Sequence, residues 1–247
     1  MKHQTENTTL ALAMTFCCFA CASAEERPKY EPTQAYEVQQ IEGWRIIVNK
    51  AFLKVEPALA SQTLTLLGHQ LYQITRVVPR PALAKLRQVK IWVEQAEPHH
   101  PCMCYHPDVE WLRDNDMNPD KAKCVELANA RTFLDWTIAQ PWMVFHELAH
   151  AYHHQFLPDG FDNVDIFKAY QSAMKTTKYD SVLHINGRQE KHYAKTNQME
   201  YFAEASEAYF GTNDFFPFVK SELKQHDEQL HELLPSVWQV TSKKSKD

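Results

Sequence analysis

The chain has 247 residues and a formal net charge of −5, and 44% of its residues are hydrophobic and 12% aromatic. This composition is sufficient to bury one sizeable core and excludes a disordered chain, so a single domain is expected. A mildly acidic chain is a poor candidate for nucleic-acid binding, which requires clustered positive charge.

The first 24 residues have the pattern of a secretory signal peptide. Lys2 precedes an apolar run over residues 10–22, and residues 22–24 read Ala-Ser-Ala, a small-x-small cleavage signature. The run is well short of the roughly 20 residues that a membrane span needs, which disfavours an anchor. No good lipobox precedes Cys21, which disfavours a lipoprotein signal. We expect cleavage after Ala24, a secreted or periplasmic protein, and no stable membrane association afterwards.

The next stretches alternate between strand and helix patterns. Residues 25–37 are rich in Glu, Pro and Lys without apolar periodicity, which predicts a leader segment. Residues 44–48 have the composition of a strand, and residues 89–93 alternate Val, Ile and Val as a second strand does. Between them, leucines at helical spacing over residues 56–78 predict a helix that must stop before Pro79.

The remainder of the chain predicts a short-stranded middle and a helical second half. Residues 99–107 form a His-, Pro- and Cys-rich loop, and residues 109–112 and 124–127 are short strand candidates. From residue 131 onward the patterns are mostly helical. A small sheet followed by helices is an α+β layout, and we expect it to form one domain over residues 38–247.

Three of the six cysteines lie in the predicted signal peptide, which leaves Cys102, Cys104 and Cys124. In an oxidising compartment, these three predict one disulfide from Cys124 to either Cys102 or Cys104, and the spacing does not say which. The alternative is a second metal site. Cys-x-Cys with one distant cysteine matches no common zinc spacing, so the disulfide is favoured.

A predicted helix over residues 141–157 carries the pattern of a zinc site. Pro141 suits the first turn of this helix. His146 and His150 are four residues apart, so their imidazoles project side by side from one face. Glu147 lies close enough on the helix to reach a water bound to the metal without being a ligand. Two neutral nitrogen ligands and an adjacent carboxylate are what hydrolytic Zn²⁺ chemistry needs.

His153 and His154 follow on the same helix, but they do not complete a longer signature. In the three-histidine form of the motif a glycine and a later histidine would occupy positions 153 and 156, where this chain has His153 and Phe156. We therefore expect surface or second-shell roles for His153 and His154.

The third ligand must come from another element, and the best candidate is a predicted helix over residues 197–211 with Asn197 at its N-cap. Glu200, Glu204 and Glu207 fall within roughly 60° of one another around its axis. One interpretation is a solvated acidic face, with Glu200 as the capping-box partner of Asn197. In the functional interpretation Glu200 binds zinc and Glu204 accepts a hydrogen bond from the far nitrogen of a ligand histidine. In both, Glu207 is expected to face solvent.

The two motifs together resemble a known family. Residues 146–150, His-Glu-Leu-Ala-His, and residues 193–205 are similar to the gluzincin-type anthrax lethal factor catalytic-domain family, which includes the Pro-Pro endopeptidases. Its second motif is Tyr, six residues, Glu, aromatic, Phe, Ala, Glu, Ala, and this sequence matches each position. The resemblance implies a zincin-like fold, Glu200 as third zinc ligand, and a hydrogen bond from Tyr193 to the transition state. It covers roughly residues 140–211, and it covers the preceding sheet only loosely.

These patterns predict an exported zinc metalloendopeptidase that cleaves a peptide or protein substrate by a zinc-activated water, with Glu147 as general base. The alternative is a zinc-stabilised binding protein or a catalytically silent pseudo-peptidase, against which Glu147 argues. His184 and His192 lie in the segment before the second motif and could also supply a donor, but they are interpreted as loop histidines. Cleavage preference, oligomeric state and any regulation by residues 25–37 are not indicated by the sequence.

Overall fold

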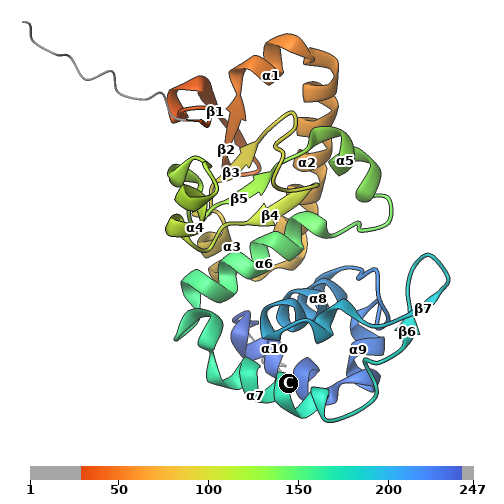
Figure 1. Ribbon diagram of the computed structural model, residues 1–247. Coiled ribbons are helices and arrows are strands. Elements are labelled where there is room, and N and C mark those ends of the chain that lie inside the picture. The colour runs from red at the N-terminus through yellow and green to blue at the C-terminus, as the bar shows by residue number, and fades with distance from the viewer. Residues whose placement is uncertain (1–28, 241–247) are drawn as a thin grey trace, which may run out of the picture.

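A computed structural model describes residues 29–240, so the predicted signal peptide and residues 25–28 of the predicted leader lie outside the described residues. The first half of the described chain forms a sheet with helices around it (Figure 1). Its elements are β1 (Tyr36–Ile41), β2 (Trp44–Asn49), α1 (Lys50–Val55), α2 (Pro57–Val77), α3 (Arg80–Leu86), β3 (Ile91–Val93), β4 (Met103–Tyr105), α4 (Val109–Asp114), β5 (Val125–Leu127) and α5 (Ala130–Trp136).

The second half is mostly helical and lies below the sheet in the view of Figure 1. Its elements are α6 (Met143–Phe156), α7 (Val164–Met174), β6 (Val182–Leu183), β7 (Gln189–Glu190), α8 (Gln198–Phe210), α9 (Lys220–His226) and α10 (Glu228–Val237). The predicted α+β layout, a small sheet followed by a helical half, is confirmed.

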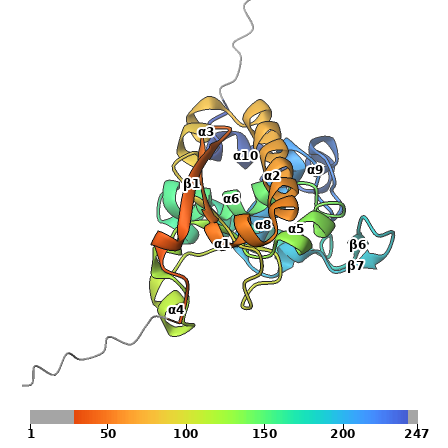
Figure 2. The same cartoon turned by 90° about the horizontal axis from the view of Figure 1, so that it is seen from above.

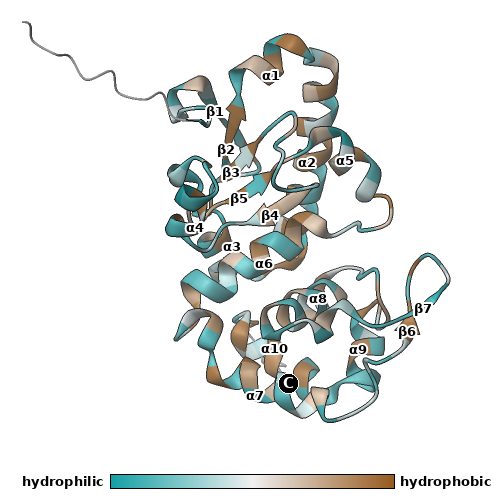
Figure 3. Ribbon diagram, in the orientation of Figure 1, coloured by the Kyte–Doolittle hydropathy of each residue, from teal (hydrophilic) through white to brown (hydrophobic). Residues whose placement is uncertain are grey.

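The main sheet has five strands in the order β1-β2-β3-β5-β4. β2, β3 and β5 are parallel to one another, and β1 and β4 pair antiparallel at the two edges. The inner strands are mostly buried, as suits strands that are covered on both faces, and β2 carries the apolar run Ile46-Ile47-Val48, brown in Figure 3. Figure 2 shows α2 alongside the strands, with α6 and α8 beneath.

Alternate residues of these strands face two different clusters, because successive side chains of a strand point to opposite faces. The main core receives Ile46, Val48, Ile91, Val93, Val125 and Leu127 together with residues of α2, α3, α6 and α8. The opposite face holds a smaller cluster of Tyr36, Ile47, Trp92 and Cys124. The sheet therefore separates two buried environments, one apolar and large, the other small and, as described below, rich in charge.

The last helix holds the two site helices together. The Trp238 ring, at the end of α10, stacks on Tyr152 of α6 with centroids 4.2 Å apart and on Phe202 of α8 at 5.6 Å. Its indole N–H donates to Ser206 Oγ at 3.0 Å, so the buried polar atom has a partner. Trp238, Tyr152 and Phe202 are all fully buried. This aromatic stack fixes how α6 and α8 face one another.

Several predicted elements differ from those observed. Residues 109–112, predicted as a strand, belong to helix α4, because the Asp108 side chain accepts a hydrogen bond from Glu110 N at 2.8 Å and caps it. β1 begins at Tyr36, inside the predicted leader, since the buried Tyr36 ring packs edge-on against Trp92. The predicted stop before Pro79 is observed, since α2 ends at Val77, but an unpredicted helix α3 follows, with Pro79 as its N-cap and Pro81 in its first turn.

The predicted disulfide is wrong: Cys102, Cys104 and Cys124 are all free. Cys102 lies in the main core, where its thiol contacts Met143 Sδ at 3.3 Å. Cys124 lies in the cluster on the opposite face of the sheet. The sheet thus keeps these two thiols apart, and Cys104 has His106 as its neighbour instead, with Sγ 3.4 Å from Nε2. Among residues 29–240, no helix combines the length and apolarity required to cross a membrane.

Candidate metal centre

Helix α6 carries the first two candidate ligands on a face that borders the core. Phe145, Leu148 and Ala149 are fully buried and anchor the helix against the sheet and α8, which leaves the intervening face for polar side chains. His146 and His150, one turn apart on that face, have ring centroids 4.7 Å apart. The helix predicted over residues 141–157 is confirmed within two residues at either end.

Helix α8 brings the third candidate. The Asn197 side chain accepts hydrogen bonds from Met199 N and Glu200 N, both at 2.9 Å, which confirms the predicted N-cap and fixes the first turn. The Glu200 carboxylate does not turn back to Asn197 as a capping box would require, but reaches across to α6.

Gly211 sets the distance between the two helices at the other end of α8. A Cβ there would lie 1.9 Å from Cε2 of Trp142, at the start of α6. No side chain larger than hydrogen fits against the indole ring without displacing it. The close approach of the end of α8 to the start of α6 therefore requires glycine at position 211.

Three acceptor atoms meet where the helices face one another. His146 Nε2 lies 3.0 Å from Glu200 Oε2, and His150 Nε2 lies 3.1 Å from the same oxygen. The two Nε2 atoms are 3.1 Å apart. Ligands about 2.0–2.1 Å from a tetrahedral zinc ion are separated by about 3.3 Å, so this triangle has the size of one face of a zinc site. His146, His150 and Glu200 are thus brought together, as the sequence predicted.

The structure assigns the neighbouring carboxylates differently from the sequence. The hydrogen bond predicted for Glu204 is made by Glu207, whose Oε1 accepts from His146 Nδ1 at 2.6 Å. Glu204 Oε1 is 3.8 Å from that nitrogen, beyond hydrogen-bonding distance. The prediction that Glu207 faces solvent is wrong, since the residue is only 3% exposed. Glu207 thus orients the His146 ring through Nδ1, so that Nε2, which faces Glu200 in the metal-free structure, is the nitrogen available to a metal once its proton is displaced.

The charges of this cluster perturb one another strongly. Burial raises the pKa of Glu204 well above its usual range, and the nearby Glu207 charge adds to the effect, so Glu204 is neutral while Glu207 accepts from His146. Burial alone would raise the pKa of Glu200, but the hydrogen bonds from His146 and His150 outweigh it and hold that pKa well below its usual range. The Glu200 carboxylate is therefore anionic, and its oxygen, which points at the two imidazoles, can serve as a metal ligand.

A cleft of about 620 Å³ runs past these residues. Glu147 and Tyr193 line it together with the three candidate ligands. Tyr193 begins a 3₁₀ turn over Tyr193–Lys195 just before α8, and it is 48% exposed. Burial of its hydroxyl, then the Glu200 carboxylate, raises the pKa of Tyr193, so it stays protonated and able to donate.

Other polar residues of the cleft were not predicted as part of the site, and of these only His184 was named from the sequence as a possible donor. His184 lines it, and His184 Nε2 lies 3.4 Å from Asp214 Oδ2, which also accepts from Gln140 Nε2 at 3.2 Å. Only an isolated β-bridge from His184 to Phe215 brings this pair to the site, and no local pattern signals it. His192, by contrast, is buried behind the cleft and accepts from Ala194 N at 3.1 Å, which turns the chain into α8.

The two further histidines of α6 do not take the roles expected of them. His153 is fully buried between Phe161 and Phe202, and neither ring nitrogen has a hydrogen-bond partner. Burial therefore lowers the pKa of His153 to about 3. His154 Nδ1 pairs with the Tyr105 hydroxyl at 2.8 Å, which ties the end of α6 to β4.

No protein-family model matches the chain, and no curated protein sequence matches it. Among solved structures, the Pro-Pro endopeptidase PPEP-2 from Paenibacillus alvei is similar, with a TM-score of 0.45 and 18% sequence identity. The alignment covers 81% of this chain and 99% of that one. A likeness of this size does not assign a family, so the membership inferred from the motifs remains a prediction.

Proposed function

We propose that the protein is an exported zinc metallopeptidase. The observation that carries the proposal is the triangle of His146 Nε2, His150 Nε2 and Glu200 Oε2, with sides of 3.0 to 3.1 Å, at the wall of an open cleft. Two imidazoles and one carboxylate with a side open to solvent are the donor set of a catalytic zinc site, whereas structural zinc sites close the fourth position with Cys or His.

The residues fit the ion chemically. Glu207 accepts from His146 Nδ1, so Nε2 is the nitrogen left for the ion to bind in place of a proton, and Glu200 is anionic. The three acceptors repel one another at these distances unless a proton or a cation lies between them. Bound zinc supplies Lewis acidity, which makes water a stronger nucleophile near neutral pH and polarises a carbonyl group.

The chain's own side chains then supply the proton transfers and the oxyanion contact. Glu147 lines the cleft beside His146 and takes a proton from the attacking water, then gives it to the leaving amine. The Tyr193 hydroxyl, protonated and half-exposed in the same cleft, donates to the oxyanion that develops on the scissile carbonyl. Glu207 keeps His146 in a single tautomer and orientation throughout.

The edge strand of the sheet supports a peptide as substrate. β4 pairs with β5 on one side only, and Met103, Cys104 and Tyr105 line the cleft. An extended peptide can add to such an edge through main-chain hydrogen bonds, which hold any sequence in register. The proposal includes export because residues 1–24 have the pattern of a signal peptide. Export would be supported if the protein isolated from outside the cell begins at Glu25, the residue after the predicted cleavage site.

Two variants separate the assigned roles. Glu147→Gln should retain zinc in wild-type amount while peptide cleavage falls by about 10²- to 10⁴-fold, the range for loss of a general base. Glu200→Ala should instead lose zinc. Metal analysis and peptide hydrolysis of both proteins test this. Wild-type cleavage by Glu147→Gln would remove the base assignment, and unchanged metal content in Glu200→Ala would move the third ligand elsewhere.

A further inference from the structure

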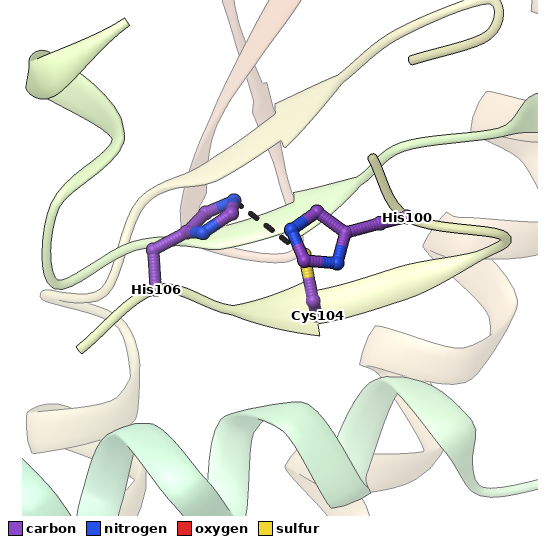
Figure 4. A group of neighbouring side chains, drawn as sticks. All are labelled: His100, Cys104 and His106. Atoms are coloured by element: carbon purple, nitrogen blue, oxygen red, sulfur yellow. Dashed lines mark hydrogen bonds between the residues drawn. The ribbon is translucent and has the colours of Figure 1, made fainter. Parts of the chain in front are cut away.

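A second group of metal-ligating side chains lies on the face of the sheet away from the main core. Cys104 on β4 stands opposite Glu126 on β5, and Glu126 stands opposite Trp92 on β3, so the three side chains share one face. His106 follows β4, and His100 belongs to the loop that precedes it. Figure 4 shows the side chains of His100, Cys104 and His106 converging.

The separations within this group suit a transition metal. One donor atom from each of His100, Cys104 and His106 lies within 4.8 Å of the other two. Cys104 Sγ is 3.4 Å from His106 Nε2. Bonds of about 2.3 Å to sulfur and 2.0–2.1 Å to nitrogen in a tetrahedral site separate these atoms by about 3.5 Å, so Cys104 and His106 already hold two donors at ligand spacing.

His100 supplies an independent observation. Its Nε2 is buried and has no hydrogen-bond partner, although the ring belongs to a surface loop. A buried polar nitrogen without a partner costs free energy unless a ligand satisfies it. Trp111 covers the pair of imidazoles, with ring centroids 5.5 Å from His100 and 6.3 Å from His106, and reduces their contact with solvent.

The charge beneath the group favours a cation. Glu126 is fully buried, and its Oε2 lies 2.6 Å from His106 Nε2. Lys121 pairs with the other oxygen of Glu126 and, at 2.8 Å, with Glu94. Two buried carboxylates therefore share one ammonium group. With neutral histidines the cluster keeps one net negative charge, which a cation at the His106 side offsets.

We propose that His100, Cys104 and His106 form a second zinc site beside the buried Glu126, with ligands different from those of the site in the cleft. His100 Nε2, Cys104 Sγ and His106 Nε2 bind the ion, and the buried Glu126 carboxylate beside His106 supplies negative charge without being a ligand. Binding releases the Cys104 thiol proton to solvent, and the neutral His106 ring carries its proton at Nδ1. The sequence concealed this site because the cysteine spacing draws attention to Cys102, whose thiol faces the main core.

The site would tie the loop before β4 to the sheet. Pro101 to Tyr105 line the cleft, and the ligands on either side of this stretch would fix that wall. The proposal does not depend on the function of the cleft, since its three ligands differ from His146, His150 and Glu200, although the β4 stretch that carries Cys104 also borders the cleft.

Cobalt titration of the purified protein tests the site, because only a thiolate ligand gives an intense sulfur-to-cobalt absorption in the near ultraviolet. The three candidate ligands of the cleft, His146, His150 and Glu200, include no sulfur, although Cys102 and Cys104 lie along its wall. The wild-type protein should develop this band on addition of Co²⁺, and Cys104→Ser should not. Cys124→Ser, which removes a neighbouring thiol outside the group, is the matched control and should retain the band. No band in the wild type, or a band that survives in Cys104→Ser, would overturn the proposal.

Zinc binding gives a second measurement that does not depend on replacing a strand residue. His100 lies in a loop, so His100→Gln should fold, as circular dichroism can verify. The zinc affinity of the His100→Gln protein at this site should fall by on the order of a hundredfold. The amount of zinc that this variant retains after dialysis should be lower than in the wild type by about one ion per chain. Unchanged zinc content in both His100→Gln and Cys104→Ser would contradict a second site, whatever the cleft binds.

Discussion

Replacing Glu207 by Ala should weaken zinc binding in the cleft by about 10- to 150-fold. The Glu207 carboxylate accepts from His146 Nδ1 at 2.6 Å, and a hydrogen bond to a charged group contributes about 1.5–3 kcal/mol. At 1.4 kcal/mol per factor of ten, that free energy gives the stated range of affinity. The same range is typical when a residue that orients a metal ligand is removed, about 10- to 100-fold.

Glu204→Ala is the matched control. Glu204 lies on the same helix and is equally buried, 4% exposed against 3% for Glu207, but its carboxylate is 3.8 Å from His146 Nδ1. Removing it empties a similar volume without removing a hydrogen bond to His146, so zinc affinity should change by less than about threefold. Glu207→Gln, which keeps an uncharged acceptor, should fall between the two variants.

Competition between each protein and a coloured zinc chelator measures these affinities. Equal losses in Glu204→Ala and Glu207→Ala would refute the reasoning, because the effect would then follow from lost volume or charge. A loss in Glu204→Ala alone would restore the assignment made from the sequence.

Tyr193→Phe should lower turnover by on the order of a hundredfold with little change in KM, since the hydroxyl acts on the developing oxyanion; a change in KM alone would exclude that role. The wild-type protein should be less stable at pH 5 than at pH 8, and in His153→Leu this decrease in the free energy of unfolding should be smaller by about 2 kcal/mol. The pKa of His153 is about 3 in the folded protein and about 6.5 in the unfolded chain, so protons bind the unfolded chain first as pH falls, and wild-type stability drops below about pH 6.5. Denaturant titrations at both pH values test this, and an unchanged difference would mean that His153 is not buried as a neutral ring. Trp238→Ala should cost about 3–5 kcal/mol of stability, and a loss below about 1 kcal/mol would contradict the stack.

The sequence was sufficient to predict those features of the site that depend on residues close together within one helix. The spacing of His146 and His150 and the Asn197 cap are properties of a few consecutive residues, and both are observed. The common side of Glu200, Glu204 and Glu207 also follows from helical geometry. Which of the last two reaches His146 depends on how α6 and α8 pack, through Gly211 and the Trp238 stack, and these contacts are distant in sequence.

The strands and side-chain directions in the middle of the chain were also hard to predict, because they depend on contacts between residues that are distant in sequence. β4 is three residues long inside a loop rich in His and Pro, and it is a strand only because β5 pairs with it. That pairing decides which face each side chain takes: Cys102 packs in the main core, while Cys104 lies with His106 and Glu126. Cysteine spacing alone predicted a disulfide, because it carries no information about faces of a sheet.

Hydrolysis of a peptide library by the purified protein, with and without a metal chelator, tests the central claim most directly. The proposed zinc peptidase should cleave peptides, lose that activity when the metal is removed, and regain it on addition of Zn²⁺. Cleavage that is unaffected by complete removal of metal would contradict a reaction centred on His146, His150 and Glu200. An absence of cleavage by zinc-loaded protein would favour a binding role for the cleft.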